Sequence, residues 1–427
     1  MKHKKIKVII LALSALLALS LVGCMPAPSE GEDTTEAKLV SAGLVSPDGL
    51  FYDVYDNGEV TITGRRDGTR ELIVPDEIDS HPVTAIGNEA FAVDGYLVYV
   101  RLGANLRTIG ENAFYGCTEL VRVDATAALK TIGFFAFYGC SILSSVNGAT
   151  GLVKIFDSAF WACPALCTID LPETLTEIGA CAFYGCSSLC AVDLPDGDIV
   201  IGSQAFYNCY SLCGVELGGL REIPAEAFYN CTSVTGVDLS KVTSVGDRAF
   251  YGCASLSAVE EDSTLEVVGS SAFYGTPWLD AQKDEFVTVG DGVLVKYNGS
   301  GGGVKIPRGV KYVSDAFAEN NGITGVEISG KATVIGTNAF YACRKLESVV
   351  ISADVSLIGE CAFMSCSRLR TIYLPDSLEE IGDSAFGACL ILTSVKYAGS
   401  ADDFAKIDIA LGNTHMTGAP IAYGARP

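Results

Sequence analysis

An Ala-Phe pair recurs along this chain of 427 residues, and this repeat limits the possible folds more than any other feature of the sequence. The interval between successive Phe residues is usually 23 residues, twice 22 and once 44, and the thirteen positions are 91, 114, 137, 160, 183, 206, 228, 250, 273, 317, 340, 363 and 386. A segment of this length cannot bury its own apolar residues, so it must stack on its neighbours. We therefore predict a repeat solenoid in which all segments share one core.

Each repeat has the same internal order. Ile-Gly or Val-Gly precedes most Ala-Phe pairs, as at Ile109-Gly110, and Cys and Leu usually follow three and six residues after the Phe. An alternating run closes the unit, and in one such run Val192 is expected to point inward while Asp193 points outward. We predict a parallel β-sheet on one face, with turns and one-turn helical or 3₁₀ pieces at the Ala-Phe pairs on the other.

This pattern resembles the BspA-like class of bacterial leucine-rich repeats. Residues 166–189 carry it in full as LxxIxLPxxLxxIGxxAFxxCxxL, and the resemblance covers residues 85 to about 397. It implies a leucine-rich repeat solenoid with flanking caps, and a function like that of the adhesins among its relatives. Three copies depart from the pattern, at Phe156, at Pro224 and in the shortened segment 313–316. We expect these departures to change local turns and to leave the architecture intact.

The segments outside the regular repeat predict caps and an insertion. Residues 46–84 contain two alternating runs around Asn57-Gly58, which is typical of a β-hairpin, and we assign them to an N-terminal cap. Residues 85–397 form the solenoid, and residues 398–427 a C-terminal cap. The double interval holds two strand-like runs around Gly290-Asp291-Gly292, so we predict a protruding hairpin within about 276–303.

The N-terminus has the features of a secretory signal. Residues 1–7 are basic and residues 8–22 are apolar but short for a membrane span. The segment Leu21-Val22-Gly23-Cys24 resembles the lipobox of bacterial lipoproteins, which implies cleavage after residue 23 and lipid attachment at Cys24. We read residues 24–45 as the lipidated Cys and a disordered acidic linker, and we expect an extracytoplasmic protein anchored to the bacterial cell envelope.

Composition narrows the classes of function. The formal net charge is −22, which disfavours nucleic acid as a partner because phosphate binding needs surplus Lys and Arg. The chain has three histidines, and two of them, His81 and His415, lie in opposite caps and cannot share a site. No GxSxG, HExxH or GxxxxGK[ST] motif occurs. We therefore predict neither enzymatic activity nor a cofactor.

The sixteen cysteines follow the repeat. Ten of them lie three residues after a repeat Phe, a phase that predicts a column of small buried side chains. The pairs Cys163/Cys167, Cys186/Cys190 and Cys209/Cys213 form a CxxxC ladder that could hold local disulfides or a metal. We predict no metal site, because structural zinc favours CxxC spacing.

Two rows of outward side chains are candidate ligand-binding sites. The acidic row occupies equivalent strand positions, where neighbouring carboxylates repel one another, and comprises Asp124, Asp170, Asp193, Glu216, Asp238, Glu260 and Glu327. The row either binds a basic protein, a cationic polymer or calcium, or it is a position of the repeat that only faces solvent. The aromatic row follows the repeat Phe and includes Trp161, Tyr184 and Tyr207. It is either a stacking platform for sugars or proteins, or a set of rings packed between neighbouring coils.

These observations favour a non-enzymatic recognition or adhesion module at the cell surface that binds a protein or polymeric ligand through its repeat surface. An envelope lipoprotein that captures a glycan or peptide for uptake, and a structural spacer, are the alternatives. Charge reversal in the acidic row would distinguish a basic protein ligand from a neutral sugar.

Overall fold

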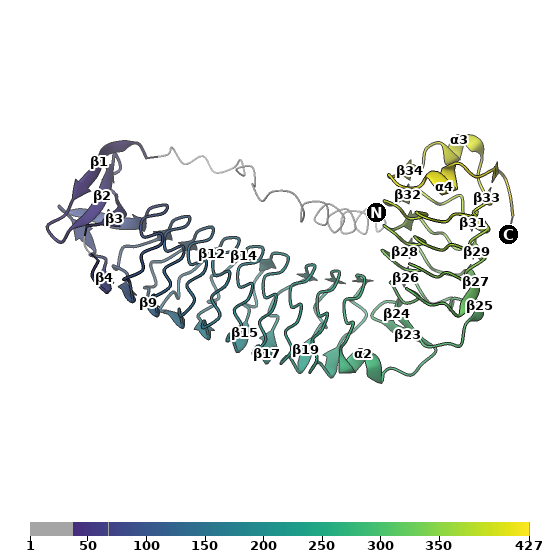
Figure 1. The fold of residues 1–427 in the computed structure, drawn as a ribbon, viewed down its shortest axis with the longest axis horizontal. Helices are drawn as coiled ribbons and strands as arrows, with labels where there is room; N and C mark the ends of the chain where they lie inside the picture. The colour runs from purple at the N-terminus through teal and green to yellow at the C-terminus, as the bar shows by residue number, and fades with distance from the viewer. Residues whose placement is uncertain (1–36, 67, 427) are drawn as a thin grey trace. The chain divides into compact units, whose positions relative to one another are not determined.

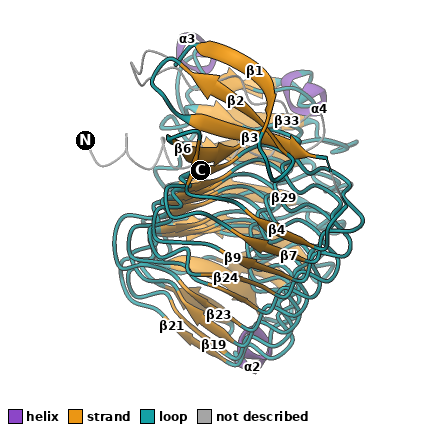
Figure 2. Cartoon of the chain, turned by 90° about the vertical axis from the view of Figure 1, so that its left-hand side faces the viewer, coloured by secondary structure: helices purple, strands orange, loops and turns teal. Residues whose placement is uncertain are grey.

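The computed structural model describes residues 37–66 and 68–426, and its contacts divide the chain into two compact units. Of the described residues, unit 1 takes in 37–66, 68–220 and 224–234, and unit 2 takes in 221–223 and 235–426. Short strands joined by turns make up both units, and the described helices are all short (Figure 2). The predicted signal segment and Cys24 lie outside the described residues.

Unit 1 contains two columns of parallel strands. The first column is β6 (His81–Ile86), β8 (Thr108–Ile109), β10 (Thr131–Ile132), β12 (Lys154–Ile155), β14 (Glu177–Ile178) and β16 (Val200–Ile201). The second is β4 (Glu71–Ile73), β7 (Tyr99–Arg101), β9 (Arg122–Asp124), β11 (Ser145–Asn147) and β13 (Thr168–Ile169), with β15 (Ala191–Asp193) and β17 (Gly214–Glu216) paired to each other. A coil therefore places one strand in each of two sheets.

The first column adds a sheet that the sequence did not predict. It is built from the Ile of the Ile-Gly motif, for example Ile132 of β10, which pairs with Ile109 and Ile155 of the neighbouring coils. A strand of two residues has no measurable alternation, so the sequence pattern shows these positions only as apolar residues before a glycine. The predicted parallel solenoid is confirmed, with both strand columns facing one core.

Antiparallel strands precede the first coil of unit 1. They are β1 (Leu39–Val45), β2 (Leu50–Tyr55) and β3 (Val60–Arg65), and β5 (Glu77–Ile78) pairs with β6. The reading of residues 24–45 as disordered linker is wrong for residues 39–45, because β1 is bonded to β2 along its length. Most of its side chains are exposed, so this edge strand shows no apolar pattern that the sequence could reveal.

Unit 2 repeats the two columns (Figure 1). On one side lie β18 (Glu222–Ile223), β20 (Ser244–Val245) and β22 (Val267–Val268), then β23 (Phe286–Val289), β24 (Val293–Tyr297), β26 (Tyr312–Val313), β28 (Val334–Ile335), β30 (Leu357–Ile358), β32 (Glu380–Ile381) and β34 (Asp408–Ile409). On the other lie β19 (Gly236–Asp238) and β21 (Ala258–Glu260), then β25 (Gly302–Lys305), β27 (Ile323–Ile328), β29 (Ser348–Ile351), β31 (Thr371–Leu374), β33 (Ser394–Tyr397) and β35 (Ile421–Ala422).

The insertion after Phe273 enters the sheet. Helix α2 (Pro277–Ala281) leads into β23, which pairs antiparallel with β24, and β24 pairs parallel with β26. The predicted hairpin is therefore present, but it does not protrude, because β24 joins the sheet. The run Val293-Leu294-Val295 is buried throughout, and a strand buried on both faces gains more from joining the stack than from extending into water.

The C-terminal segment continues the stack. Strands β34 and β35 pair with the last coil, and α3 (Ala401–Phe404) and α4 (Thr414–Thr417) stand where other coils have turns. The ring of Phe404 lies against the rings of Tyr397 and Tyr423, at centroid distances of 5.2 and 6.0 Å. These contacts cover the core at this end.

Hydrogen bonds between backbones fasten each Ala-Phe turn to the next. In the turn at Phe114, the N–H groups of Phe114 and Gly116 donate to the carbonyl oxygens of Ala136 and Tyr138 of the following coil, at 2.8 and 2.7 Å. Asn112 and Gly116 have positive φ angles, which a right-handed helix cannot contain. The segment is therefore a run of bonded turns, and of the expected turns and one-turn helical or 3₁₀ pieces only the turns are present here.

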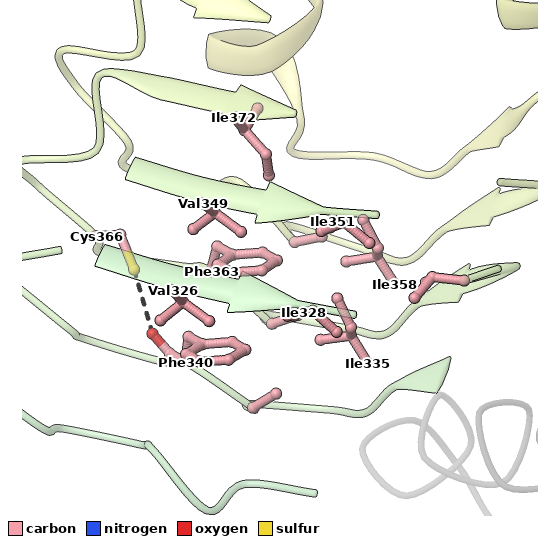
Figure 3. Packing of buried hydrophobic residues seen from close by; sticks show 14 of the residues in the cluster. Val326, Ile328, Ile335, Phe340, Val349, Ile351, Ile358, Phe363, Cys366 and Ile372 are labelled. Carbon is pink, nitrogen blue, oxygen red and sulfur yellow. Dashed lines mark hydrogen bonds between the residues drawn. The ribbon is translucent and has the colours of Figure 1, made fainter. Parts of the chain in front are cut away.

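The repeat Phe residues form the centre of the core. In unit 1, Phe137, Phe160 and Phe183 are fully buried and stacked at centroid distances of 5.1 and 5.3 Å. Figure 3 shows the same arrangement in unit 2, where Phe340 and Phe363 lie one above the other. The valines and isoleucines of both strand columns surround them (Figure 3). The spacing of the Phe residues thus corresponds to one layer of core per coil.

Candidate functional site

The predicted acidic residues lie in register within each unit. In unit 1, Asp193 of β15 is opposite Glu216 of β17, and in unit 2, Asp238 of β19 is opposite Glu260 of β21. All four side chains are exposed, while Val192, Val215 and Val237 beside them are buried. We call Asp170, Asp193 and Glu216 of unit 1 the carboxylate ladder. Asp170 directly follows β13, and its Oδ2 accepts a hydrogen bond from Gly148 N–H at 3.1 Å.

Two members of the acidic row are neutralised by neighbouring residues. Asp124 accepts hydrogen bonds from the hydroxyl of Tyr99 and from Arg122 Nε, both at 2.7 Å. Burial opposes ionisation of Asp124, but these hydrogen bonds hold its pKa below the ordinary value. Glu327 pairs with Lys305 at 2.8 Å. A continuous acidic strip is therefore not present, since the cations stand on the same strand or the next one.

Asp193 and Glu216 differ from these two residues. Among the described residues, no Lys or Arg forms an ion pair with either carboxylate. Residues directly opposite in neighbouring strands have Cβ atoms about 5 Å apart, so two like charges there are destabilising. This part of the ladder keeps an electrostatic cost that a bound cation would remove.

The aromatic row is packed within itself. Trp161 and Tyr184 stack at a centroid distance of 4.6 Å, and Tyr184 and Tyr207 at 4.6 Å, with Tyr229 next at 4.5 Å. Both faces of the Tyr184 and Tyr207 rings are thus covered by neighbouring rings. Burial raises the pKa of Tyr207 to about 12. At Tyr184 and Tyr207 the row offers edges and hydroxyl groups to a ligand, and it does not offer free ring faces to a sugar.

The cysteine column is buried as predicted, and each thiol has a defined acceptor. Cys140 Sγ donates to the carbonyl oxygen of Phe114 at 3.2 Å, and Cys366 Sγ donates to that of Phe340 at 3.2 Å (Figure 3). The same bond recurs from coil to coil, which gives the small polar S–H group a partner inside the core. All fifteen described cysteines are free thiols. Burial raises the pKa of Cys186 to about 12, so the thiolate is disfavoured.

Alkylation should separate the cysteines into two groups. Because thiolate character and access control reactivity, Cys190 and Cys213, which are exposed, are expected to react with iodoacetamide in the folded protein. The ten thiols of the column should react only after unfolding. Peptide mass spectrometry before and after addition of denaturant measures this. Labelling of Cys140 or Cys186 at the rate of Cys190 in the folded protein would contradict the buried column.

The coils of this chain match a known family of repeat proteins. The family model for the BspA type leucine rich repeat region matches residues 84–213, 153–280 and 297–407, which is more than half of the chain. The chain belongs to the BspA-type leucine-rich repeat family. No relative was found among curated proteins.

Solved structures give the BspA-type chain further neighbours. It is 23% identical to a leucine-rich repeat protein from Bacteroides ovatus, covering 85% of this chain and 98% of that one, with a TM-score of 0.50. It is also 23% identical to a leucine rich cell surface protein from Faecalibacterium prausnitzii, covering 87% and 97%, with a TM-score of 0.43. At these identities the likeness concerns the fold.

Within the described part of this BspA-type chain, no helix is long and apolar enough to cross a bilayer, and no group of His, Cys, Asp and Glu is arranged to hold a metal ion. Besides the carboxylate ladder, the structure contains a recess that the sequence did not reveal.

The recess lies in unit 2, beside the insertion, and has a volume of about 830 Å³. Ser271, Lys296, Asp315 and Glu319 are among the residues that line it. Its signals in the sequence are the 44-residue interval between Phe273 and Phe317 and the shortened segment 313–316. Neither signal shows a cavity until the path of the insertion is known.

Proposed function

We propose that this protein is a lipoprotein held at the bacterial cell surface through Cys24, where its coils bind a basic region of a partner protein without catalysing a reaction. The observation that carries the proposal is the in-register pair Asp193 and Glu216, with which no described Lys or Arg forms an ion pair. A partner that brings Lys or Arg to this place relieves the repulsion and gains charge-assisted hydrogen bonds.

The anchor in this proposal comes from the N-terminal sequence. The basic residues 1–7, the apolar residues 8–22 and the segment Leu21–Cys24 together have the order of a lipoprotein signal. Two or more acyl chains on Cys24 would give lasting attachment, because each buried methylene contributes about 0.8 kcal/mol. Mass spectrometry of the mature N-terminus tests this part, and an unmodified N-terminus other than Cys24 would contradict it.

A protein ligand is favoured over a glycan because of the aromatic row. Sugars bind to exposed ring faces, and the faces of Tyr184 and Tyr207 are occupied by their neighbours. The carboxylate ladder, in contrast, is open to solvent. The repetition of carboxylates along a coil stack suits an extended basic surface better than a small cation.

Charge reversal in the ladder should abolish binding. We expect the triple variant Asp170→Lys, Asp193→Lys and Glu216→Lys to bind polylysine and basic matrix proteins roughly tenfold or more weakly than the unchanged chain. Biolayer interferometry at two salt concentrations measures the affinity, and binding by the unchanged chain should weaken with salt. The same charge change at exposed positions outside the ladder, Glu119→Lys, Asp354→Lys and Asp376→Lys, is the control.

Two results would contradict the proposed function. One is an equal loss of binding in the ladder variant and in the control, which would mean that only net charge matters. The other is the absence of binding by the folded protein to any member of a panel of basic proteins, matrix proteins and cell-wall glycans.

A further inference from the structure

The coil that follows Phe273 has a strand but no Ala-Phe turn. Strand β24 occupies this level in its sheet, where it pairs with β26 and Asp291 N–H donates to the carbonyl oxygen of Leu265 in the preceding coil at 2.8 Å. On the turn side the chain runs into α2 and the hairpin instead (Figure 1). The turns at Phe273 and Phe317 therefore face each other with one turn missing between them.

At this level of the stack, side chains fill the core, but no backbone occupies the position of the missing turn. The ring of Trp278 packs on Phe273 and the ring of Tyr297 packs on Phe317, both at a centroid distance of 4.8 Å. These two rings stand where the missing coil would place its Phe. What remains open is the recess of about 830 Å³ between the two turns, a size within the range of roughly 300–1,000 Å³ typical of ligand sites.

One wall of the recess carries unused donors. In the turn before it, Phe250 N–H and Gly252 N–H donate to the carbonyl oxygens of Ala272 and Tyr274, each at 2.8 Å. The equivalent groups one coil later are the N–H groups of Phe273 and Gly275, and within the described residues neither has an acceptor. Both residues line the recess.

The opposite wall carries unused acceptors. In the turn after the recess, the carbonyl oxygens of Ala339 and Tyr341 accept from Phe317 N–H and Glu319 N–H at 3.2 and 2.6 Å. The equivalent acceptors one coil earlier are the carbonyl oxygens of Ala316 and Ala318, and no described residue donates to them. Both of these alanines line the recess as well.

A side chain already substitutes for part of the missing turn. Oδ2 of Asp315 accepts hydrogen bonds from the backbone N–H of Ser271 at 2.7 Å and from its hydroxyl at 2.9 Å. In a regular coil the N–H at this position donates to a backbone carbonyl, as Asn112 N–H donates to Phe134. Asp315 thus satisfies one of three donors and leaves the other two available.

The ligand that matches both walls is a peptide backbone. The free donors are two residues apart and the free acceptors are two residues apart, which is the period of an extended chain. Main-chain hydrogen bonds of this kind give affinity when a peptide joins an existing stack of strands or turns. The lining includes Asp280, Asp315 and Glu319 together with Lys296, whose ammonium group already donates to the carbonyl oxygen of Leu279 at 2.8 Å. The excess of negative charge favours basic residues beside the bound segment.

We propose that the recess binds a short segment of a partner polypeptide, with small side chains at its centre and basic residues at its ends, as a substitute for the missing turn. This inference rests on the proposed function only in that both concern recognition of a basic polypeptide. The residues involved are separate from the carboxylate ladder, so the two sites can fail independently.

Hydrogen exchange of the full chain tests the proposal directly. The probe is a mixture of capped hexapeptides with lysine at both ends and Ala, Ser, Gly or Thr at the four central positions. We expect the peptides to slow exchange of the Phe273 and Gly275 amides roughly tenfold or more, while the already bonded amides of Phe250 and Gly252 do not change. The variant Glu319→Lys should weaken this protection, and the ladder variant should retain it.

A matched probe separates backbone recognition from charge. The same peptides with the central amides N-methylated keep both lysines but cannot donate to Ala316 and Ala318. We expect them to bind roughly tenfold or more weakly, because two hydrogen bonds are lost. Equal binding by the methylated peptides, or no protection of Phe273 and Gly275 at millimolar peptide, would overturn the proposal. Loss of protection in the ladder variant would do so as well, because it would place the peptide on the ladder.

Discussion

Replacing Phe160 with alanine is expected to lower the free energy of unfolding of unit 1 by about 3–5 kcal/mol. The side chain is fully buried, and its ring lies between the rings of Phe137 and Phe183 at 5.3 Å or less. Its loss would leave a cavity that the adjacent coils cannot close, because their own spacing is set by backbone hydrogen bonds. Urea denaturation followed by circular dichroism measures the change.

The control for this experiment is Tyr115→Ala, one residue after a repeat Phe. Tyr115 is 37% exposed and stacks on one described ring, that of Tyr138. We expect the free energy of unfolding of this variant to fall by about 1 kcal/mol. If the two substitutions cost the same, the Phe column would not be the centre of the core, and the stacked arrangement of the coils would be in doubt.

Replacing Gly359 with alanine is expected to destabilise unit 2 by about 3 kcal/mol. This glycine follows β30, and an added Cβ would lie 2.7 Å from the backbone nitrogen of Thr337 and 2.8 Å from the carbonyl carbon of Gly336. Both atoms belong to the backbone of the preceding coil, so they cannot move aside without breaking the stack. The reason for the Ile-Gly motif is thus the close approach of two backbones, in addition to the tight turn that the sequence suggested.

Gly309→Ala is the matched control in the same unit. No atom lies within 4 Å of a Cβ added at Gly309, and its φ angle is not positive. We expect the free energy of unfolding to change by no more than about 1 kcal/mol. An increase is expected, because alanine restricts the conformations of the unfolded chain. Thermal unfolding of both variants compares them, and a similar loss for Gly309→Ala would show that the contact with Thr337 is not the cause.

The sequence predicted those features that each coil repeats. The interval between Phe residues predicted one core layer per coil, and alternation at Val192 and Asp193 separated the buried face from the exposed one. The phase of the cysteines placed them inside. All of these features depend on residues that recur at a constant distance along the chain. A periodic sequence shows that distance directly.

Features that differ from one copy to the next were not predictable. The charge on Asp124 is compensated by Arg122 two residues away, and that of Glu327 by Lys305 on the next strand, yet both acids fit the acidic row by position. The sequence left turns and one-turn helical pieces undistinguished at the Ala-Phe pairs, because the left-handed angles of residues such as Phe135 have no signature in side-chain type. The recess became visible only when the path of the insertion placed β24 in the sheet and left the turn side empty.

The short strands determine how the protein responds to force. In unit 2, successive coils are joined by ladders of about two to four residues, as between β30 and β32 and between β31 and β33. A pull on the ends of such a stack breaks a few bonds at a time, so coils detach singly. Each detached coil of 23 residues adds up to about 80 Å of extended chain. A protein of this kind, tethered at a surface under flow, would lengthen in steps and dissipate the load before its attachment gives way.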